Sequence, residues 1–302
     1  MNIRYAHITD TASIRQLWET AFGAEEPYTQ WYFSNVYRPD RTLCGFIDSE
    51  LVTMAQFAPY TMSVCDESIP VVYLVGVATA PQHQKKGYSH RLLRQFLDDL
   101  SHSSYQMALL YTDIPNFYRP LGFNQIYNLR NINFRTADAI PADNWQLLTP
   151  TEQEMQHCDK IYRKMCSTMD GYILRGTKDW FTLCEAYPQD KGIIFGYSCD
   201  AYALCMFDDD SFILRELGYN SKQSMADGLN WTKHQAKQHG YESIIWRAPI
   251  ATDLPVQNGE KNYPYVMALL LDARLNPADT AAIITEQFLQ RSARPLWISE
   301  MT

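Results

Sequence analysis

Hydrophobic positions along this chain alternate between helical and strand-like spacing. In residues 9–22 the apolar side chains recur at i, i+3, i+4 and i+7, which is the stripe of an amphipathic helix. Three strand-like runs follow at residues 43–47, 51–60 and 71–79, and short polar turns separate them. The pattern predicts one helix followed by an antiparallel meander of three strands.

A helical repeat then begins near Gly87, and strand-like runs follow at residues 106–112 and 124–134. The second half of the chain repeats this order, with helices at residues 152–165 and 225–239 and strands at residues 192–197, 201–207, 212–218 and 243–248. The third strands of the two halves end 138 residues apart, near Thr79 and Leu217. The strands after the long helices are 136 residues apart. These similar offsets predict a duplicated fold of mixed α and β structure.

The domain limits follow from this repeat. A chain of 302 residues is long enough for two domains. Residues 136–150, rich in Ala, Asp, Pro and Asn, are the predicted linker. We therefore expect a first domain at residues 1–137, a second at residues 138–262 and a short C-terminal segment at residues 263–302.

Composition places the chain among ordinary globular proteins, with 46% hydrophobic and 20% charged residues. Residues near the N-terminus show no secretory pattern, and the longest apolar runs are shorter than the ~18 residues that span a bilayer. We expect a cytoplasmic protein with no membrane partner. The seven cysteines form no C-x-x-C pair and the seven histidines form no zinc-binding pattern, so we expect reduced thiols and no metal.

The formal net charge of −8 bears on the choice of partner. An acidic chain is a poor match for nucleic acid as the main ligand. The negative field favours a cationic substrate such as an amine, although the same charge also serves simply to keep a protein soluble.

A basic glycine turn lies between the strand at residues 71–79 and the helix that follows it. It reads Gln84, Lys85, Lys86, Gly87, Tyr88 and Ser89. A turn that opens a helix offers backbone N–H groups without intrahelical partners, and the helix dipole favours an anion there. The turn is therefore a candidate phosphate site. The alternative is a plain solvated turn with two surface lysines.

A second candidate is Tyr118, which follows the strand at residues 106–112 in an aromatic turn. A phenol, with a reference pKa near 10, can return a proton to a departing thiolate. The alternative is that Tyr118 and its aromatic neighbours are core residues around a Pro-Leu-Gly turn.

The two strings together resemble a known superfamily. Residues 75–89 are similar to the acetyl-CoA motif of the GNAT acyltransferases, Q/R-x-x-G-x-G/A, and Ser89 departs from the usual final Gly or Ala. Residues 118–123 resemble the second signature of that superfamily, Y-x-x-x-G-F/Y. The resemblance implies tandem GNAT domains, each with a mixed, mainly antiparallel central sheet flanked by helices. It also implies acetyl-CoA as the co-substrate and an amine as the acceptor.

The resemblance further implies roles for individual residues. The pyrophosphate of acetyl-CoA would lie on residues 84–89. The backbone of Val77, Ala78 and Thr79 would bind the pantetheine arm and offer an N–H to the developing oxyanion. Asp113 is placed with the cofactor-binding residues, and Tyr118 would be the general acid.

The tandem arrangement and the string at residues 171–180 are similar to the enhanced-intracellular-survival (Eis-like) acetyltransferases. Those proteins combine an active GNAT domain, a degenerate second one and a sterol-carrier-like C-terminal domain. Only about 40 residues follow Tyr263, so a third domain would be reduced to a remnant. By this resemblance the terminal carboxylate of Thr302 is the candidate general base. Glu25, Glu26, Asp113 or direct proton loss to water are the alternatives.

The candidate acceptor pocket contains Glu25, Tyr28, Trp31 and Tyr32, because aromatic faces beside carboxylates suit a cationic amine. A simpler account assigns half of the aromatic residues to the core. Aminoglycosides, polyamines, peptide N-termini and lysine side chains all stay open as acceptors, as does a longer acyl group as donor. The resemblance favours a homo-oligomer.

Two other functions compete with an acetyl-CoA-dependent enzyme. One is a non-catalytic regulatory or scaffold protein that binds CoA, which the uncertain base and the missing third domain would favour. The other is a tandem GNAT protein that takes its acyl group from aminoacyl-tRNA, which the net charge of −8 disfavours.

Overall fold

The computed structural model describes residues 1–23, 27–64, 66–149, 151–189, 192–249, 252, 254, 260–264 and 266–271. The chain divides into two compact units. The first unit contains Met1–Ile126 and the described residues from Val266 onward, and the second contains the described residues between 127 and 264.

The first unit is built on one mixed sheet with the strand order β1-β2-β3-β4-β5-β15-β6. Its strands are β1 (Asn2–Tyr5), β2 (Thr42–Ile47), β3 (Glu50–Val64), β4 (Glu67–Thr79), β5 (Met107–Tyr111), β6 (Asn124–Gln125) and β15 (Val266–Leu270). Neighbouring strands are antiparallel except for β4 and β5, which are parallel. The predicted antiparallel meander, β2-β3-β4, is confirmed.

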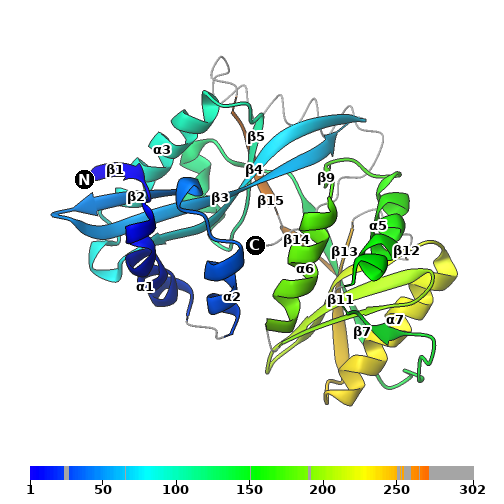
Figure 1. The fold of residues 1–302 in the computed structure, drawn as a ribbon. Coiled ribbons are helices and arrows are strands. Elements are labelled where there is room, and N and C mark those ends of the chain that lie inside the picture. Colours follow the sequence, from blue (N-terminus) through cyan, green and yellow to red (C-terminus); the bar gives the residue numbers. More distant parts are fainter. Residues whose placement is uncertain are drawn as a thin grey trace. The chain divides into compact units, whose positions relative to one another are not determined.

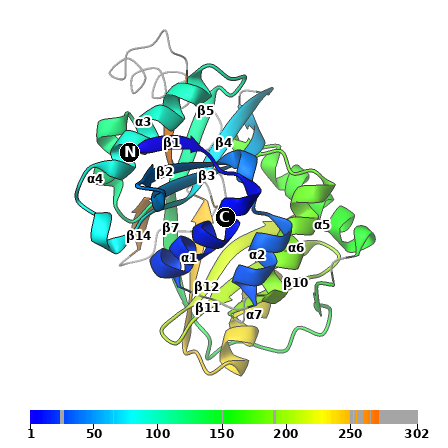
Figure 2. The ribbon, with the colours of Figure 1, turned by 60° about the vertical axis from the view of Figure 1, so that its left-hand side comes forward.

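Helices cover both faces of this sheet (Figures 1 and 2). They are α1 (Thr11–Phe22), α2 (Tyr28–Asn35), α3 (Tyr88–Ser101) and α4 (Pro115–Tyr118), with short 3-10 turns at Ile8–Asp10, Pro39–Arg41, Pro81–His83 and Arg119–Leu121. Helices α1 and α2 lie against one face, where Ile14, Tyr32 and Met54 belong to one core cluster. Helix α3 lies against the other face and buries Leu92 and Phe96 in a second cluster. The alternation of residues along β3 and β4 separates the two cores.

The second unit is built on a sheet with the order β14-β7-β13-β12-β11-β10-β8. Its strands are β7 (Asn128–Arg135), β8 (Gln146–Leu147), β10 (Ile193–Tyr197), β11 (Ala201–Phe207), β12 (Phe212–Tyr219), β13 (Ser243–Pro249) and β14 (Lys261–Pro264). The short strand β9 (Tyr172–Ile173) is not part of this sheet. The pair β12–β13 is parallel and the other neighbours are antiparallel. Its helices are α5 (Glu152–Cys166), α6 (Thr177–Gln189) and α7 (Lys222–Gln238).

The same strand pattern therefore occurs twice. In each unit a strand is antiparallel to the one before it and parallel to the one that follows the long helix, as β3-β4-β5 and β11-β12-β13. The strand on the far side of the parallel pair differs in origin. Beside β5 it is β15, from the end of the described chain, whereas beside β13 it is β7, which comes directly after the first unit.

The positions of β7 and β15 differ from the predicted domain limits. The units divide between Ile126 and Tyr127 rather than at residue 137. The predicted linker at residues 136–150 lies inside the second unit, where the backbone N–H of Thr136 donates to Glu242 O and Trp145 is buried. The described part of the predicted C-terminal segment is not separate, since β14 joins the second sheet and β15 joins the first.

The second unit encloses a buried ion pair. The guanidinium of Arg175 donates to both carboxylate oxygens of Glu216, at 2.7 and 2.8 Å, and both side chains are almost fully buried. The hydroxyl of Tyr202 donates to the same carboxylate at 2.6 Å. The guanidinium also lies 4.2 Å above the ring of Tyr162. Because both charges are paired and hydrogen-bonded, the fold can bury them.

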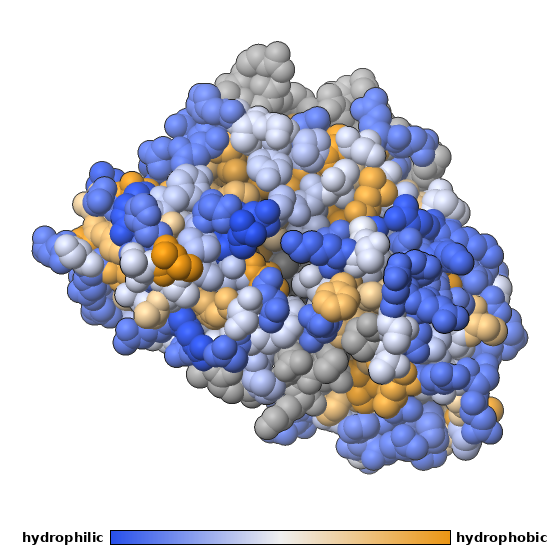
Figure 3. Space-filling model, in the orientation of Figure 1, coloured by the Kyte–Doolittle hydropathy of each residue, from blue (hydrophilic) through white to orange (hydrophobic). Residues whose placement is uncertain are grey.

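Polar residues cover much of the face shown in Figure 3, and the apolar side chains on it are scattered. Among the residues that the structure describes, the most exposed large apolar ones are Ile8, Leu147, Ile140 and Ile114. Among the described helices, none has the length and apolar character needed to cross a bilayer.

Candidate active site

Strands β4 and β5 separate part of the way along the sheet. Their parallel pairing ends at Tyr73 opposite Leu109. Strand β4 nevertheless continues to Thr79, and β3 stays paired with it to that end. The edge of β4 that faced β5 therefore opens over its last residues, and a ligand can approach the backbone there.

A bulge interrupts β4 at this opening. Met54 is opposite Ala78 and Gln56 is opposite Val75, so Gly76 and Val77 together face one residue of β3. Gly76 has a φ of +57°, and a Cβ at this position would lie 2.7 Å from the Trp18 ring. Only glycine fits both the backbone conformation and the close approach of the tryptophan.

The last residue of β4 turns its backbone towards the opening. The N–H of Ala80 donates to Val52 O at 2.9 Å, so these two residues form a hydrogen-bonded pair. In antiparallel strands such pairs alternate with non-hydrogen-bonded ones, which places Thr79 and Thr53 in a pair of the second kind. The N–H and C=O of Thr79 therefore point away from β3. The C=O accepts from Gln84 Nε2 at 3.2 Å.

The predicted phosphate turn has the backbone shape of an anion site. Lys85 has a φ of +60°, and Gly87, with a φ of +77°, directly precedes α3. Within the described part of the chain no side chain caps this helix, and no heavy atom other than those of its chain neighbours lies within 4 Å of where a Cβ on Gly87 would be. The first N–H groups of α3 thus face open space at the positive end of the helix dipole. Of the two lysines, Lys86 is held by a bond from its Nζ to Gln82 O at 2.8 Å.

A surface groove of about 890 Å³ continues from Gly87 along α3. Its lining residues are Met1, Asn2, Ile3, Gly87, His90, Arg91, Arg94, Gln95 and Asp98. Arg91 and Arg94 are exposed and one helical turn apart, and neither has an ion-pair partner in the described part of the chain. The groove therefore adds two cations to the turn that precedes it.

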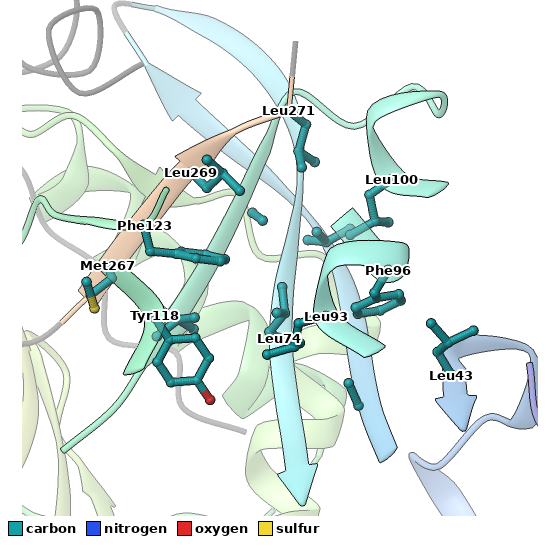
Figure 4. Close-up of a cluster of buried hydrophobic side chains, with 14 of the residues drawn as sticks. Leu43, Leu74, Leu93, Phe96, Leu100, Tyr118, Phe123, Met267, Leu269 and Leu271 are labelled. Atoms are coloured by element: carbon teal, nitrogen blue, oxygen red, sulfur yellow. The ribbon is translucent and has the colours of Figure 1, made fainter. Parts of the chain in front are cut away.

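Tyr118 ends α4 and lies in the core cluster on the α3 face of the sheet. Its ring packs edge-on against Phe117 and Phe123, with centroids 4.9 and 5.9 Å away. Figure 4 shows the phenol oxygen directed away from the labelled leucine side chains. The hydroxyl has no hydrogen-bond partner among the described residues, and burial raises the pKa of Tyr118 to about 12. It is a neutral donor that is free to bond a ligand.

A histidine connects the phosphate turn to this tyrosine. His90 lies in the first turn of α3, and its Nε2 is 2.9 Å from Phe117 O. Because a carbonyl only accepts, Nε2 carries the proton in this bond. The rings of His90 and Phe117 also pack against each other, with centroids 4.5 Å apart. The start of α3 and the turn that carries Tyr118 are therefore held together.

The predicted aromatic pocket is partly core. Tyr32 is buried on α2 and stacks on Trp18 of α1, with centroids 4.7 Å apart. Tyr28 and Trp31 are half-buried and pack on each other at 5.9 Å. Since Trp18 also reaches Gly76, the aromatic cluster lies at the β4 bulge, on the face of the sheet opposite α3.

Other predicted site residues are not drawn together by the structure. Asp113 is exposed just after β5, where it accepts a bond from the Tyr111 hydroxyl at 2.9 Å. Glu25, Glu26 and Thr302 lie outside the described residues.

Sequence reasoning missed Trp18 as a site residue, and it also missed Gln56 and His90. A signal was present for Gln56, because it is a polar residue on the apolar face of the strand predicted at residues 51–60. No pattern indicated His90, since its role depends on a turn 27 residues away.

Residues 2–126 match the family model described as an acetyltransferase (GNAT) domain. No curated protein matches the chain. Among solved structures, the GCN5-related N-acetyltransferase from Kribbella flavida superposes with a TM-score of 0.71 at 15% identity, over 90% of this chain and 71% of that one.

Two further structures are similar along the chain. The GCN5-related N-acetyltransferase from Anabaena variabilis ATCC 29413 has a TM-score of 0.71 at 12% identity, over 89% of this chain and 72% of that one. Eis1 from Mycobacterium abscessus has a TM-score of 0.66 at 15% identity, over 90% of this chain and 74% of that one. At these identities the likeness shows a shared fold, and it extends over both units.

Proposed function

Because residues 2–126 match the family model of a GNAT acetyltransferase domain, we propose that the protein is an N-acetyltransferase that moves the acetyl group of acetyl-CoA to a primary amine by direct attack. The acyl-transferring fold is common to the family, while the donor, the acceptor and the roles of the residues are the proposal. One observation carries it. The opening between β4 and β5, the uncapped Gly87 turn and the unbonded Tyr118 phenol all belong to the same part of the first unit.

The opening and the turn are suited to acetyl-CoA. The pyrophosphate binds on residues 84–89, where N–H groups and the helix dipole favour negative charge. The pantetheine arm lies along Val77, Ala78 and Thr79 of β4 and bonds the backbone groups there that point away from β3, among them those of Thr79. The groove past Gly87, with Arg91 and Arg94, accepts the phosphorylated nucleotide end.

The reaction then needs one bond formed and one broken. The neutral amine attacks the thioester carbonyl, and a β4 backbone N–H stabilises the oxyanion. As the C–S bond breaks, Tyr118 delivers its proton to sulfur. Its pKa of about 12 is above that of a thiol in water, but burial of the thiolate raises the sulfur's pKa in the same way. Holding amine and thioester together provides much of the rate gain.

The proton lost by the attacking amine requires an acceptor. The carboxylate of Thr302 is the proposed base, with Glu25, Glu26 or water as alternatives. Asp113 is a weaker choice, because it is exposed and already bonds Tyr111.

The aromatic cluster of Tyr28, Trp31 and Tyr32 is proposed to form part of the acceptor pocket. Aromatic faces attract a cationic amine before it loses its proton. The cluster lies across the sheet from α3, so the acceptor approaches the thioester from the face opposite the phosphate turn.

Thiol release from acetyl-CoA, measured against a panel of amines, tests the function. The variant Gly87→Glu places bulk and negative charge in the open space above the turn, and we expect it to abolish acetyl-CoA binding in calorimetry. Gly240→Glu is the matched control, because Gly240 has a φ of +87° and equally open surroundings but lies in the second unit. If Gly87→Glu keeps the native affinity for acetyl-CoA, the assignment of residues 84–89 to the pyrophosphate is wrong.

Removal of the last four residues separates the possible bases. Loss of turnover on this truncation supports the terminal carboxylate, and surviving turnover moves the base to an internal group or water. If the full-length protein binds acetyl-CoA tightly but releases no thiol with any amine, the protein is a CoA-binding regulator or scaffold instead.

A further inference from the structure

Gln56 is a buried polar residue beside the β4 bulge that the reaction described above does not use. It lies on β3, opposite Val75, and only 3% of its surface is exposed. Its side chain points to the α1 and α2 face, as do those of its strand neighbours Met54 and Ala78. An amide in such apolar surroundings is unfavourable unless its donors and acceptor are satisfied.

One half of this amide is fixed. The hydroxyl of Tyr32 donates to Gln56 Oε1 at 2.9 Å. Burial holds the pKa of Tyr32 far above its ordinary value, so this hydroxyl stays protonated and the bond persists at any physiological pH. Tyr32 is itself held by its stacking on Trp18. The bond therefore sets the orientation of the amide plane.

The other half is left without a partner. Gln56 Nε2 is buried and makes no hydrogen bond within the described part of the chain. Buried donors in native proteins are nearly always satisfied, so an orphaned one needs an explanation. A donor that a bound ligand satisfies is one such explanation.

The position of this donor indicates which ligand it serves. A Cβ on Gly76 would lie 3.3 Å from Nε2 and 2.7 Å from the Trp18 ring, so the donor lies at the β4 bulge, beside this glycine. The phosphate turn and Tyr118 belong to the α3 side of the sheet, whereas Gln56 is on the side of the aromatic cluster. The donor therefore lies on the side of the sheet from which the acceptor is proposed to approach, and not on the side of the phosphate turn.

The chemistry of an N–H donor restricts its partner on that acceptor. The attacking nitrogen is excluded, because its lone pair must reach the thioester and its protonated form has none. We propose that Gln56 Nε2 donates a hydrogen bond to an oxygen of the acceptor close to its reacting amine. The acceptor class is then amines with a neighbouring hydroxyl or carbonyl oxygen. This inference rests on the proposed transferase function.

A pair of isosteric acceptors tests the specificity. Ethanolamine and propylamine differ by a hydroxyl in place of a methyl group, and kcat/KM is expressed per concentration of unprotonated amine. A site that bonds a substrate hydroxyl rejects the analogue without it, because its own polar group stays unpaired. We expect the native protein to prefer ethanolamine by about 10-fold or more.

The variant Gln56→Met keeps the length of the side chain and removes the donor. We expect it to bring the ratio of the two kcat/KM values to within about 2-fold of unity, the residual contrast of a merely apolar pocket. Affinity for acetyl-CoA should be unchanged. The control Gln16→Met alters an exposed glutamine on α1 and should keep the native ratio. Tyr32→Phe should lower the ratio in part, because the amide loses its fixed orientation.

The outcomes separate this inference from the proposed function. A ratio that survives in folded Gln56→Met overturns the specificity role while the transferase function stands. If Gln56→Met does not fold, Gln56→Asn retracts the amide by one methylene and must show the same loss of preference. Absence of turnover in the native protein with every amine, despite acetyl-CoA binding, overturns the function and this inference with it.

Discussion

The phenol of Tyr118 is the side-chain group with the most direct part in the proposed reaction, as its proton donor. The side chain is buried, with 8% of its surface exposed, and desolvation is the cause that raises its pKa to about 12. At neutral pH it is therefore fully protonated, which a proton donor requires. The same hydrophobic packing holds the ring in place between Phe117 and Phe123.

Replacing Tyr118 by phenylalanine removes only the donor. We expect kcat to fall by ~10²-fold or more, the scale of a positioned general acid, while the dissociation constant of acetyl-CoA is unchanged. Tyr105→Phe is the matched control, since Tyr105 packs on the same core cluster and should keep full activity. An unaltered kcat in Tyr118→Phe would remove this residue from the mechanism.

The raised pKa of Tyr118 also predicts the pH dependence of the rate. The active form is the acid, and it is lost only as pH rises through about 12. The amine must be neutral to attack, so activity should rise with pH from the acidic side. We expect kcat/KM of the native protein to rise with pH. Below about pH 10 we expect no decrease that can be assigned to Tyr118, that is, none that disappears in Tyr118→Phe. A falling limb near pH 9 that disappears in this variant would contradict the pKa.

At the scale of elements, the ion pair between Arg175 and Glu216 in the second unit links the turn before α6 to β12. Arg175 and Glu216 are both nearly fully buried, so the loss of one leaves the other uncompensated. We expect Arg175→Met to lower the free energy of unfolding by about 3–5 kcal/mol. Chemical denaturation followed by tryptophan fluorescence measures this, because Trp180 lies 4.8 Å from the guanidinium.

The double variant Arg175→Met/Glu216→Gln provides the matching control. It removes both charges, and we expect it to recover a large part of the lost stability. A single variant as stable as the native protein would show that the pair is hydrated in solution.

Element prediction from the sequence succeeded where periodicity was strong and failed where it depended on neighbours. The stripe of residues 9–22 predicted α1, and the runs at 43–47, 51–60 and 71–79 predicted β2, β3 and β4. The alternating run at residues 124–134 predicts one strand, yet the structure divides this region into β6 and β7, which pair in different sheets. Alternation reports which face a residue takes and not which strand lies beside it.

The candidate site shows the same limit. The turn at residues 84–89 and Tyr118 were predicted from their own strings. Gln56 and Trp18 gain their significance only because the β4 bulge brings Gly76 against them. A polar residue in a buried strand can be noticed in a sequence, but whether its donor is satisfied depends on contacts that only the fold provides.

At the scale of the whole molecule, the first unit is not a continuous piece of the chain. Strand β15 pairs with β5 over five positions and with β6 over two, and it arrives only after the entire second unit. Met267, Leu269 and Leu271 belong to the same core cluster as Tyr118. The site therefore depends on a segment that a boundary at residue 137 would discard.

A fragment of residues 1–137 should consequently fail to fold. Burial of three such side chains contributes roughly 5–9 kcal/mol at 1.5–3 kcal/mol each, which is comparable to the total stability of a domain. Without β15, the edge of β5 would also lose its backbone partners. We expect the fragment to show no cooperative thermal transition by circular dichroism and no acetyl-CoA binding by calorimetry.

Joining residues 266–271 to the fragment through a flexible linker should restore both the transition and the binding. The same joined segment with polar residues at positions 267, 269 and 271 should restore neither. A cooperative transition and native affinity in the plain fragment would show that the first unit folds and binds its cofactor without β15.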